Sequence, residues 1–453
     1  MKLIEKFSVQ IQIILYIRNR RYADMNIVGL ITEYNPFHKG HEYHIQKAKE
    51  ITNADACVVI MSGNYVQRGT PAFIDKHTRT GIALNHGADM VFELPLPFAC
   101  SSAEYFATAA VTLLHKMGVV THLCFGAECD NIKKLQDIAS ILADAKLDNT
   151  HPLNQYIKDN VNAGIPYAAA RSDALARYID TCGTDTLNDY VSILNKPNNI
   201  LAIEYLKTLG LLGSDIIPVA IERTKASYHD NSENNPLYSA SSVRAAILNN
   251  NNADIDTDTL DKLYAFSPEY KDVMQRTAPI TENDISNITS TKLLATCFSQ
   301  DNILSDYMGV DKDLANRMAN RDILLNHTSF NDLIEKLKTK NIAYTSISRA
   351  LLAITLEIKK SDIESYIDNN ISSYIRLLGF RREASIILSK IKQKGNLTII
   401  GQLSEINDKI GLNTIDKQML SHSIYCDELY NMIVRNKYKC PFINEYQRKI
   451  IIQ

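Results

Sequence analysis

One run of residues near the start of the chain, residues 27–44, most constrains how the protein can fold. It begins with an apolar stretch, residues 27–32, which is typical of a buried parallel strand. An Asn-Pro pair at 35–36 then ends the strand, because proline has no backbone N–H and restricts the residue before it. Gly40 allows a tight turn, and a helical pattern starts at His41. This order predicts an anion site, because free backbone N–H groups and the positive end of the helix dipole point into the turn.

Two histidines flank the glycine of this turn, in the pattern His38-x-Gly40-His41. Two imidazole donors beside free amides suit a polyphosphate whose negative charge grows during a reaction. Two other interpretations stay open: a pair of surface histidines, or a zinc site, which is the weaker one because no cysteine or carboxylate partner is evident. The helix that follows is expected to bury Tyr43, Ile45, Ala48 and Ile51.

This stretch resembles the signature of the HxGH nucleotidyltransferase superfamily, and a longer string is similar to one branch of it, the tRNA(Met) cytidine acetate ligase family. The string is Glu33-Tyr34-Asn35-Pro36-Phe37-His38-x-Gly40-His41-x-Tyr43-His44. Other parts of the chain carry the same resemblance to beyond residue 380, so it covers most of the protein. The resemblance implies that His38 and His41 are catalytic. It also implies that ATP contacts Ile31, Thr32, Glu33, Tyr34, Asn35, Pro36, Phe37, His38, Lys39, Gly40, His41, Glu42, Tyr43 and His44.

Length and composition are those of an ordinary globular protein of 453 residues, long enough for about two or three domains. Apolar residues make up 45 % and charged residues 22 %, and the formal net charge of −2 does not point to a nucleic-acid binder, although it can hide a local basic face. Eight cysteines without a CxxC pair indicate reduced thiols in the cytoplasm. No apolar run approaches the roughly 20 residues of a membrane span. Residues 1–25 are expected to be a dispensable extension or a misassigned start, because their apolar run is short and arginines follow it.

Apolar runs alternate with helical patterns through the first half of the chain. Strands are expected at residues 27–32, 54–64, 89–95, 121–128 and 216–223, with helices around 76–87 and 102–117. This rhythm predicts an α/β fold with a Rossmann-like, doubly wound parallel sheet. Ligands gather at the carboxyl ends of such strands, so residues 32–35 and 62–64 are expected to face one crevice. Lys76 and Arg79, near the start of a helix, belong either to a solvated helix face or to a contact with phosphate or tRNA.

Further candidate ligand residues lie at strand ends and helix starts. Gly126 lets a nucleotide approach the backbone, unless it is a plain turn glycine, and Asn198 either contacts ATP or caps its helix. Arg223 ends a strand, where a guanidinium can clamp a phosphate. The run Ser241-Ser242-Val243-Arg244 opens a later helix as a second anion site facing the first, unless it is a plain cap. The resemblance marks these positions as nucleotide contacts: Gly126, Asn198, Arg223, Ser241, Ser242 and Arg244.

An asparagine-rich run at residues 249–254 is the clearest linker signal. It divides the chain, after the extension at 1–25, into a nucleotidyltransferase-like domain at 26–248 and a mainly α-helical C-terminal domain at 249–453. In the second domain strand-like runs are rare, and residues 341–349 and 374–382 stand out. Basic residues beside aromatic ones suit RNA there, although a solvated helix face is the commoner cause of such a pattern. The weak candidates for tRNA binding are Arg376, Arg381, Arg382 and Lys390.

Two facing anion sites around one crevice predict chemistry at the α-phosphate of ATP, in which a carboxylate attacks and pyrophosphate leaves. The resemblance implies that acetate is the carboxylate, that acetyl-adenylate is the intermediate, and that the wobble cytidine of elongator tRNA(Met) receives the acetyl group as N4-acetylcytidine. Mg²⁺ is expected to bridge phosphate oxygens, without protein ligands. Two alternatives stay open: an adenylyltransferase for a small phosphorylated cofactor precursor, and a non-catalytic RNA-binding protein. The residues identify neither the proton acceptor for the cytidine amine nor an oligomeric state.

Overall fold

The structure is a computed structural model, and it describes most of the chain from Met25 onward. The described ranges are 25–129, 131–165, 167–181, 193–194, 196–222, 239–249, 279–299, 303–340, 342–406, 411–441 and 443–453. The predicted N-terminal extension, apart from its last residue, lies outside these ranges. So do Arg223 and all of the predicted linker except Asn249.

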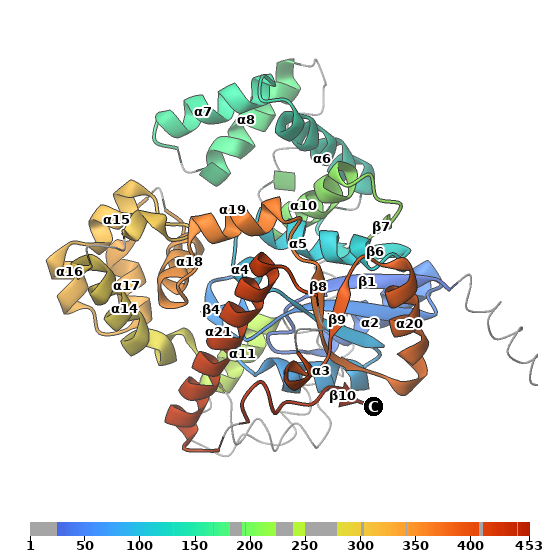
Figure 1. Ribbon diagram of the computed structural model, residues 1–453. Helices are drawn as coiled ribbons and strands as arrows, with labels where there is room; N and C mark the ends of the chain where they lie inside the picture. Colours follow the sequence, from blue (N-terminus) through green and yellow to red (C-terminus); the bar gives the residue numbers. More distant parts are fainter. Residues whose placement is uncertain are drawn as a thin grey trace, which may run out of the picture.

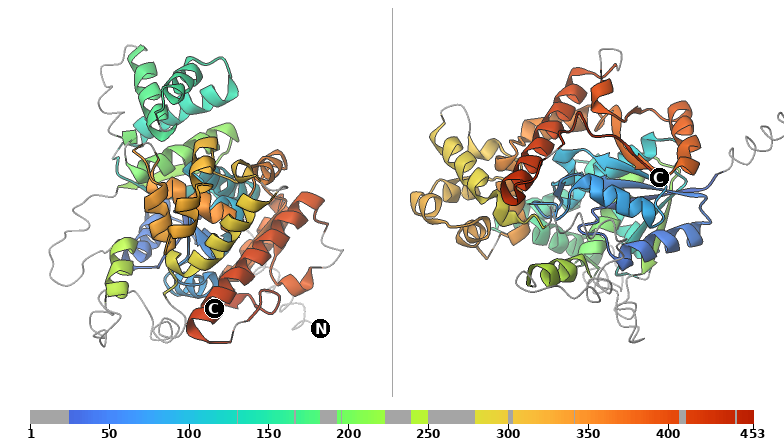
Figure 2. Two further views of the ribbon diagram at one scale, coloured as in Figure 1. Left: turned by 90° about the vertical axis from the view of Figure 1, so that its left-hand side faces the viewer. Right: turned by 90° about the horizontal axis from the view of Figure 1, so that it is seen from below.

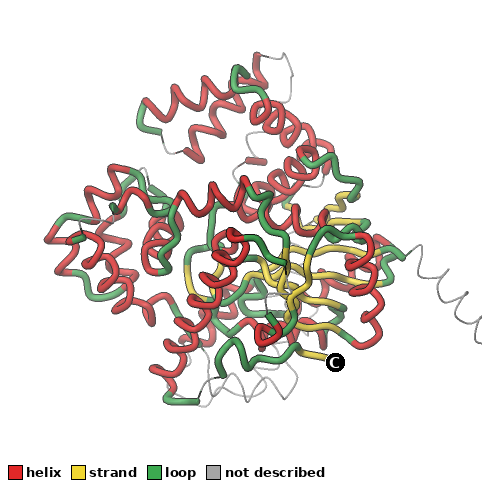
Figure 3. Tube along the Cα trace, viewed as in Figure 1, coloured by secondary structure: helices red, strands yellow, loops and turns green. Residues whose placement is uncertain are grey.

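A mixed, mainly parallel sheet forms the centre of the molecule, with helices around it (Figures 1 and 3). The hydrogen-bonded order is β10-β8-β5-β2-β1-β6-β7, with β9 paired to β8, and among the strand pairs described for this sheet only β5–β8 is antiparallel. The five strands expected from the sequence are confirmed, as is the α/β class. The strands are β1 (Ile27–Thr32), β2 (Ala56–Ser62), β5 (Met90–Leu94), β6 (His122–Ala127), β7 (Ile217–Glu222), β8 (Tyr374–Phe380), β9 (Thr398–Ile400) and β10 (Ile451–Ile452).

The two faces of the sheet bury alternate residues of the same strands, because successive side chains in a strand point to opposite sides. Val28 and Leu30 pack with α2 (Lys39–Thr52) and α3 (Lys76–Asn85) on one face. Ile27 and Val58 belong to the larger core on the other face, which includes α5 (Ala103–Lys116) and α10 (Pro197–Leu211). Burial on both faces explains why the strands read as continuous apolar runs.

The C-terminal part of the chain is mainly helical, as expected, but it also adds β8, β9 and β10 to the sheet. The sequence boundary near residue 249 therefore does not separate two independent sheets or cores: β8 lies directly against β5. The residues of β8 are almost all buried. β8 therefore covers an edge of the sheet that the N-terminal part alone would expose. The helices are α14 (Ser286–Phe298), α15 (Lys312–Met318), α16 (Arg321–Asn326), α17 (Phe330–Leu337), α18 (Tyr344–Thr355), α19 (Lys360–Asp368), α20 (Ser385–Lys394) and α21 (Thr414–Tyr438).

A group of three helices, α6 (Ile132–Leu147), α7 (Pro152–Asn162) and α8 (Tyr167–Thr181), projects away from the sheet (Figures 1 and 2). It is attached through α6, which packs along α10. Among the described helices, none is long and apolar enough to span a membrane.

The strand order changes direction at β1, which has β2 on one side and β6 on the other. β1 pairs with β2 along its whole length, but with β6 only at Val28–His122 and Gly29–Leu123. Pairing between β1 and β6 therefore stops before their carboxyl ends. In open α/β sheets this switch in strand order is where ligands bind, outside the carboxyl ends of the strands.

Candidate active site at the carboxyl edge of the sheet

The two histidines lie where the switch in strand order predicts a ligand site, between β1 and α2. His38 is the N-cap of α2: its Nδ1 accepts a hydrogen bond from the Gly40 N–H at 3.0 Å. The Nδ1 of His41 accepts from the His38 N–H at 3.3 Å, and the two rings stack with centroids 3.8 Å apart. Because Nδ1 accepts in both rings, this hydrogen-bond pattern assigns each neutral imidazole the tautomer that carries its proton on Nε2. The ring proton of each histidine then lies on Nε2.

Gly40 is required by this arrangement. A Cβ atom at residue 40 would lie 2.8 Å from Cε1 and 3.0 Å from Nδ1 of His38. A side chain there would push the His38 ring off the start of the helix, so the glycine of the His-x-Gly-His pattern has a steric cause.

Buried aromatic side chains pack against the turn between β1 and α2. Tyr34 and Phe37 are fully buried, and the Tyr34 ring packs edge-on against Phe37 at 4.8 Å and His41 at 4.9 Å. Asn35 accepts the Phe73 N–H through Oδ1 at 2.7 Å, which ties the turn to a neighbouring loop. The buried rings fix the shape of the turn, and the histidines lie on top of them.

The start of α2 differs slightly from the sequence expectation. The helix begins at Lys39, with His38 as its cap, and it buries Ile45, Ala48 and Thr52. Tyr43 and Ile51, which were expected to face inward, are 44 % and 49 % exposed. The buried stripe follows the helical spacing of 45, 48 and 52, and positions 43 and 51 fall outside it.

Arg79 is buried, which corrects both interpretations made from the sequence. Its guanidinium donates to backbone carbonyls of Ile74 (2.8 Å), Glu33 (2.5 Å), Ser62 (3.0 Å) and Gly63. Glu33 follows the carboxyl end of β1, and Ser62 and Gly63 lie at the carboxyl end of β2, so Arg79 holds the two loops of the expected crevice together. Burial lowers the pKa of Arg79 from its ordinary value. Sequence reasoning missed this role because no local pattern distinguishes a buried arginine from an exposed one at the start of a helix.

Lys76 and Arg376 are also buried, and they form one ion network. Lys76 Nζ contacts Glu93 (2.8 Å), Glu445 (3.2 Å) and Asp427. Arg376 contacts the same three carboxylates at 3.0–3.3 Å. Lys76 therefore belongs to no solvated helix face, and Arg376, which was a candidate for tRNA binding, belongs to the interior. Arg376 is buried because it belongs to β8, which lies inside the sheet rather than at the surface.

Asn198 lies against the segment that follows β6, close in sequence to Gly126. The Glu128 carboxylate, two residues after Gly126, accepts from the Asn198 side chain at 2.6 Å and from the Asn199 N–H at 2.9 Å. In return, Oδ1 of Asn199 accepts from the Glu128 N–H at 2.8 Å. The structure thus brings Asn198 close to the end of the strand that contains Gly126. It also shows that a carboxylate of the protein itself caps the start of α10.

The Ser241-Ser242-Val243-Arg244 run lies in the first turns of α11 (Ala240–Asn249), and its arginine reaches the turn between β1 and α2. Ser239 Oγ accepts the Ser242 N–H at 3.1 Å and caps this helix. The Arg244 guanidinium donates to the Asn35 carbonyl, within the turn that leads to the histidines. The predicted second element therefore does lie against the first one.

The remaining candidates for tRNA binding lie at the opposite edge of the sheet. β8 runs antiparallel to β5, with Phe380 opposite Met90, and the Arg381 N–H donates to the Asp89 carbonyl just before β5. Arg382 is exposed, and Arg381 and Lys390 are partly exposed. In Figure 1, α20 lies at the right-hand end of the sheet and α11 beyond its left-hand end. These basic residues are therefore not neighbours of the histidine turn.

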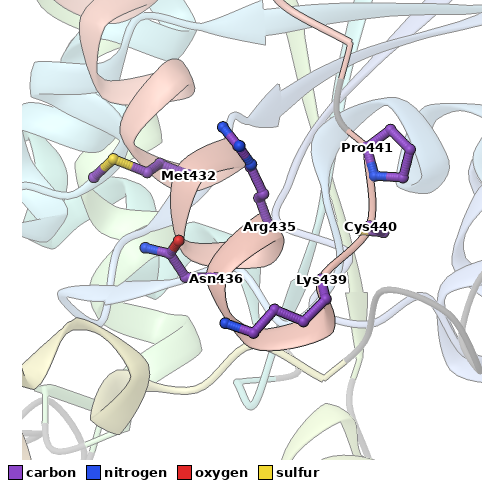
Figure 4. Close-up of a pocket in the computed structure, with 6 residues that line it drawn as sticks. All are labelled: Met432, Arg435, Asn436, Lys439, Cys440 and Pro441. Atoms are coloured by element: carbon purple, nitrogen blue, oxygen red, sulfur yellow. The ribbon is translucent and has the colours of Figure 1, made fainter.

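A surface pocket of about 670 Å³ lies at the end of α21, and none of the predicted site residues lines it. Its residues come from the last turns of α21 and the segment after it, as Figure 4 shows: Met432, Arg435, Asn436, Lys439, Cys440 and Pro441. Within the described part of the chain, no group of three or more His, Cys, Asp and Glu side chains could hold a metal ion. The described cysteines are all free thiols, and most of them are buried.

Comparison with known proteins identifies the family of the chain. A family model described as HIGH Nucleotidyl Transferase matches residues 25–442. The chain is 38 % identical over 387 residues to a tRNA(Met) cytidine acetate ligase of Clostridium perfringens (strain SM101), covering 84 % of this chain and 90 % of that protein. It is 38 % identical over 409 residues to the ligase of the same name from Clostridium novyi (strain NT), covering 89 % and 97 %.

A solved structure agrees along almost the whole length. The crystal structure of Thermotoga maritima TmcAL bound with α-thio-ATP superposes with a TM-score of 0.82 at 26 % identity, covering 94 % of this chain and 99 % of that one. The predicted family is thereby confirmed. The chain belongs to the HIGH nucleotidyl transferase family, in the branch of the tRNA(Met) cytidine acetate ligases.

Proposed function

We propose that this protein is an ATP-dependent ligase that activates acetate as acetyl-adenylate and acetylates N4 of the wobble cytidine in elongator tRNA(Met). The observation that carries the proposal is the pair of stacked imidazoles at the start of α2, with Arg244 docked on the same turn. Nε2–H donors, helix amides and a guanidinium around one turn stabilise negative charge on phosphate oxygens. The names of the relatives supply acetate and tRNA(Met) as the substrates.

ATP would lie over the turn, with its phosphates at the start of α2. The proposed contacts extend from Ile31 to His44 and include Arg244. Gly126, in β6, and Asn198, which is hydrogen-bonded to Glu128 just after β6, would border the nucleotide. The proposed set is completed by Arg223, Ser241 and Ser242.

Mg²⁺ would enter bound to the phosphate oxygens of ATP. No described cluster of protein ligands competes for it, and magnesium keeps several waters when it bridges phosphates. The ion would supply charge neutralisation on the phosphates. The imidazoles and Arg244 would supply the fixed part of that charge stabilisation.

The first step is in-line attack. An acetate oxygen forms a bond to the α-phosphorus, and the bond from that phosphorus to the pyrophosphate oxygen breaks. Acetate is already ionised at neutral pH, so this step needs no general base. His38 and His41 would donate from Nε2 to oxygens whose negative charge increases in the transition state, an interaction that lowers the barrier only because it strengthens there.

In the second step, the exocyclic amine of cytidine attacks the acetyl carbon and AMP leaves. The nitrogen loses a proton, which a basic group must accept. The basic residues Arg381, Arg382 and Lys390 lie at the far edge of the sheet, so we propose that they contact tRNA away from the anticodon base. As tRNA is the substrate, we place the protein in the cytoplasm.

The test is acetate-dependent exchange of labelled pyrophosphate into ATP by the purified protein. The proposal predicts exchange with acetate and none with a phosphomonoester. Exchange with a phosphomonoester alone would favour an adenylyltransferase of cofactor synthesis. Binding of tRNA without any exchange would favour a non-catalytic RNA-binding protein.

A further inference from the structure

A short hairpin beside the candidate site carries an arginine with no role so far. The hairpin pairs β3 (Tyr65–Val66) with β4 (Thr70–Pro71), and the Gly69 N–H donates to the Val66 carbonyl at 2.9 Å to close its tip. The strands are buried, but Arg68 at the tip is exposed. No described residue forms a hydrogen bond or an ion pair with its side chain. A well-anchored backbone thus presents a guanidinium that has no partner in the part of the chain that the structure describes.

The hairpin is anchored on both sides of Arg68. On one side, the Gln67 N–H donates to Glu33 Oε1 at 2.7 Å, which ties the tip to the segment between β1 and α2. On the other side, Ser348 Oγ donates to the Gly69 carbonyl at 2.9 Å. Gly69 has a φ of +82°, and a Cβ there would lie 2.4 Å from the Arg349 backbone nitrogen. The chain therefore fixes Arg68 between the first turn and α18.

The positive charges near the tip of the hairpin favour the binding of an anion. Burial raises the pKa of Glu33, and the Gln67 N–H, Arg68, Arg244 and Arg79 act in the opposite direction. Burial lowers the pKa of Arg244, and Arg68 lowers it further because the two guanidinium groups repel each other. Glu33 and Glu282 offset this repulsion only in part. Two arginines close enough to repel each other are stabilised when a phosphate binds to both.

We propose that Arg68 is a further nucleotide-binding residue, which grips a phosphate of ATP across from Arg244. Arg244 is docked on Asn35, and Gln67, the neighbour of Arg68, is bonded to Glu33, so both arginines are tied to the segment that leads to His38. A planar guanidinium can donate two parallel hydrogen bonds to phosphate oxygens, which orients the group as well as binding it. Arg68 is then the cation that closes the phosphate site on the side of the C-terminal helices.

The test measures binding of α,β-methylene-ATP, which cannot release pyrophosphate, to the full chain by isothermal titration calorimetry. Arg68→Gln removes the charge, and Arg68→Lys keeps it but loses the paired donors. Arg321→Gln, at an exposed arginine in the first turn of α16, is the matched control. We expect roughly 10- to 100-fold weaker binding for R68Q, a smaller loss for R68K and no change for R321Q.

Binding of the analogue by R68Q with wild-type affinity would overturn the inference. A variant that binds the analogue normally but has lost affinity for tRNA would also overturn it, because Arg68 would then serve the nucleic acid. Thermal unfolding of each variant confirms that an exposed substitution leaves the fold intact. The inference rests on the proposed function only in taking ATP as the ligand. Because neither acetate nor tRNA is present in the titration, failure of the wild type to acetylate tRNA would leave this comparison valid.

Discussion

At the scale of single residues, His41 is the most direct probe of the proposed chemistry. Its ring is held by the His38 N–H and by contact with Tyr34, so its donor is fixed relative to the turn. Removing one fixed donor to a developing negative charge typically costs about 10²–10³ in rate. We expect His41→Ala to reduce pyrophosphate exchange by that factor and to leave tRNA affinity nearly unchanged. His115→Ala, at an exposed histidine of α5, is the control, and an unchanged rate in H41A would contradict the role.

The buried ion network is expected to make the stability of the fold depend on pH. Burial, reinforced by Glu445 and Glu93 and opposed by Lys76 and Arg376, raises the pKa of Asp427 to about 8. Burial also disfavours the Glu445 carboxylate, but Lys76, His77 and Arg376 outweigh it and hold the pKa of Glu445 far below its usual range. The network has three carboxylates and two permanent cations, so a proton kept on one carboxyl balances the charge.

The raised pKa of Asp427 makes the free energy of unfolding depend on pH. A carboxyl whose pKa is raised on folding stabilises the fold below its unfolded pKa of about 4, and this contribution is lost as the pH rises from about 4 to about 8. Asp427→Asn cannot titrate, so its free energy of unfolding should fall less over that range than that of the wild type. Urea unfolding at several pH values measures this. Equal pH dependence in both proteins would show that Asp427 is ionised in the fold.

At the scale of elements, the hairpin and α18 depend on a glycine for their close approach. Gly69→Ala combines an unfavourable φ with a collision against the Arg349 backbone. Gly164→Ala is a matched control, because Gly164 has a φ of +84° but open space around its Cβ position. We expect G164A to cost about 1 kcal/mol and G69A clearly more, by urea unfolding. Equal costs would mean that α18 does not hold the hairpin.

At the scale of the whole molecule, the sheet combines strands from both ends of the described chain. β1 follows Met25 directly, and β10, near the C-terminus, pairs with β8. A variant that starts at Met25 keeps every described residue, so we expect its exchange activity and unfolding midpoint to equal those of the full chain. Failure of this variant to fold would refute the expectation that the extension is dispensable.

The sequence predicted those parts of the fold that have local signals. Residues 27–32 and 54–64 read as buried strands because both of their faces are apolar, and Gly40 and Pro36 marked the turn between β1 and α2. The burial of Lys76 was not predictable, because two of its partners, Asp427 and Glu445, lie more than 300 residues away in the chain. The pairing of β8 with β5 was missed for the same reason. The docking of Arg244 on the first turn agrees with the expected facing elements, because both lie at the carboxyl edge of one sheet.

The central claim is that the turn between β1 and α2 activates acetate with ATP so that a tRNA cytidine can be acetylated. The most direct measurement is mass spectrometry of nucleosides from an unmodified tRNA(Met) transcript after incubation with the purified protein, acetate and ATP. The account predicts N4-acetylcytidine that requires both acetate and ATP and carries the label of isotopic acetate. Absence of N4-acetylcytidine in the complete reaction, or its formation without ATP, would contradict the account.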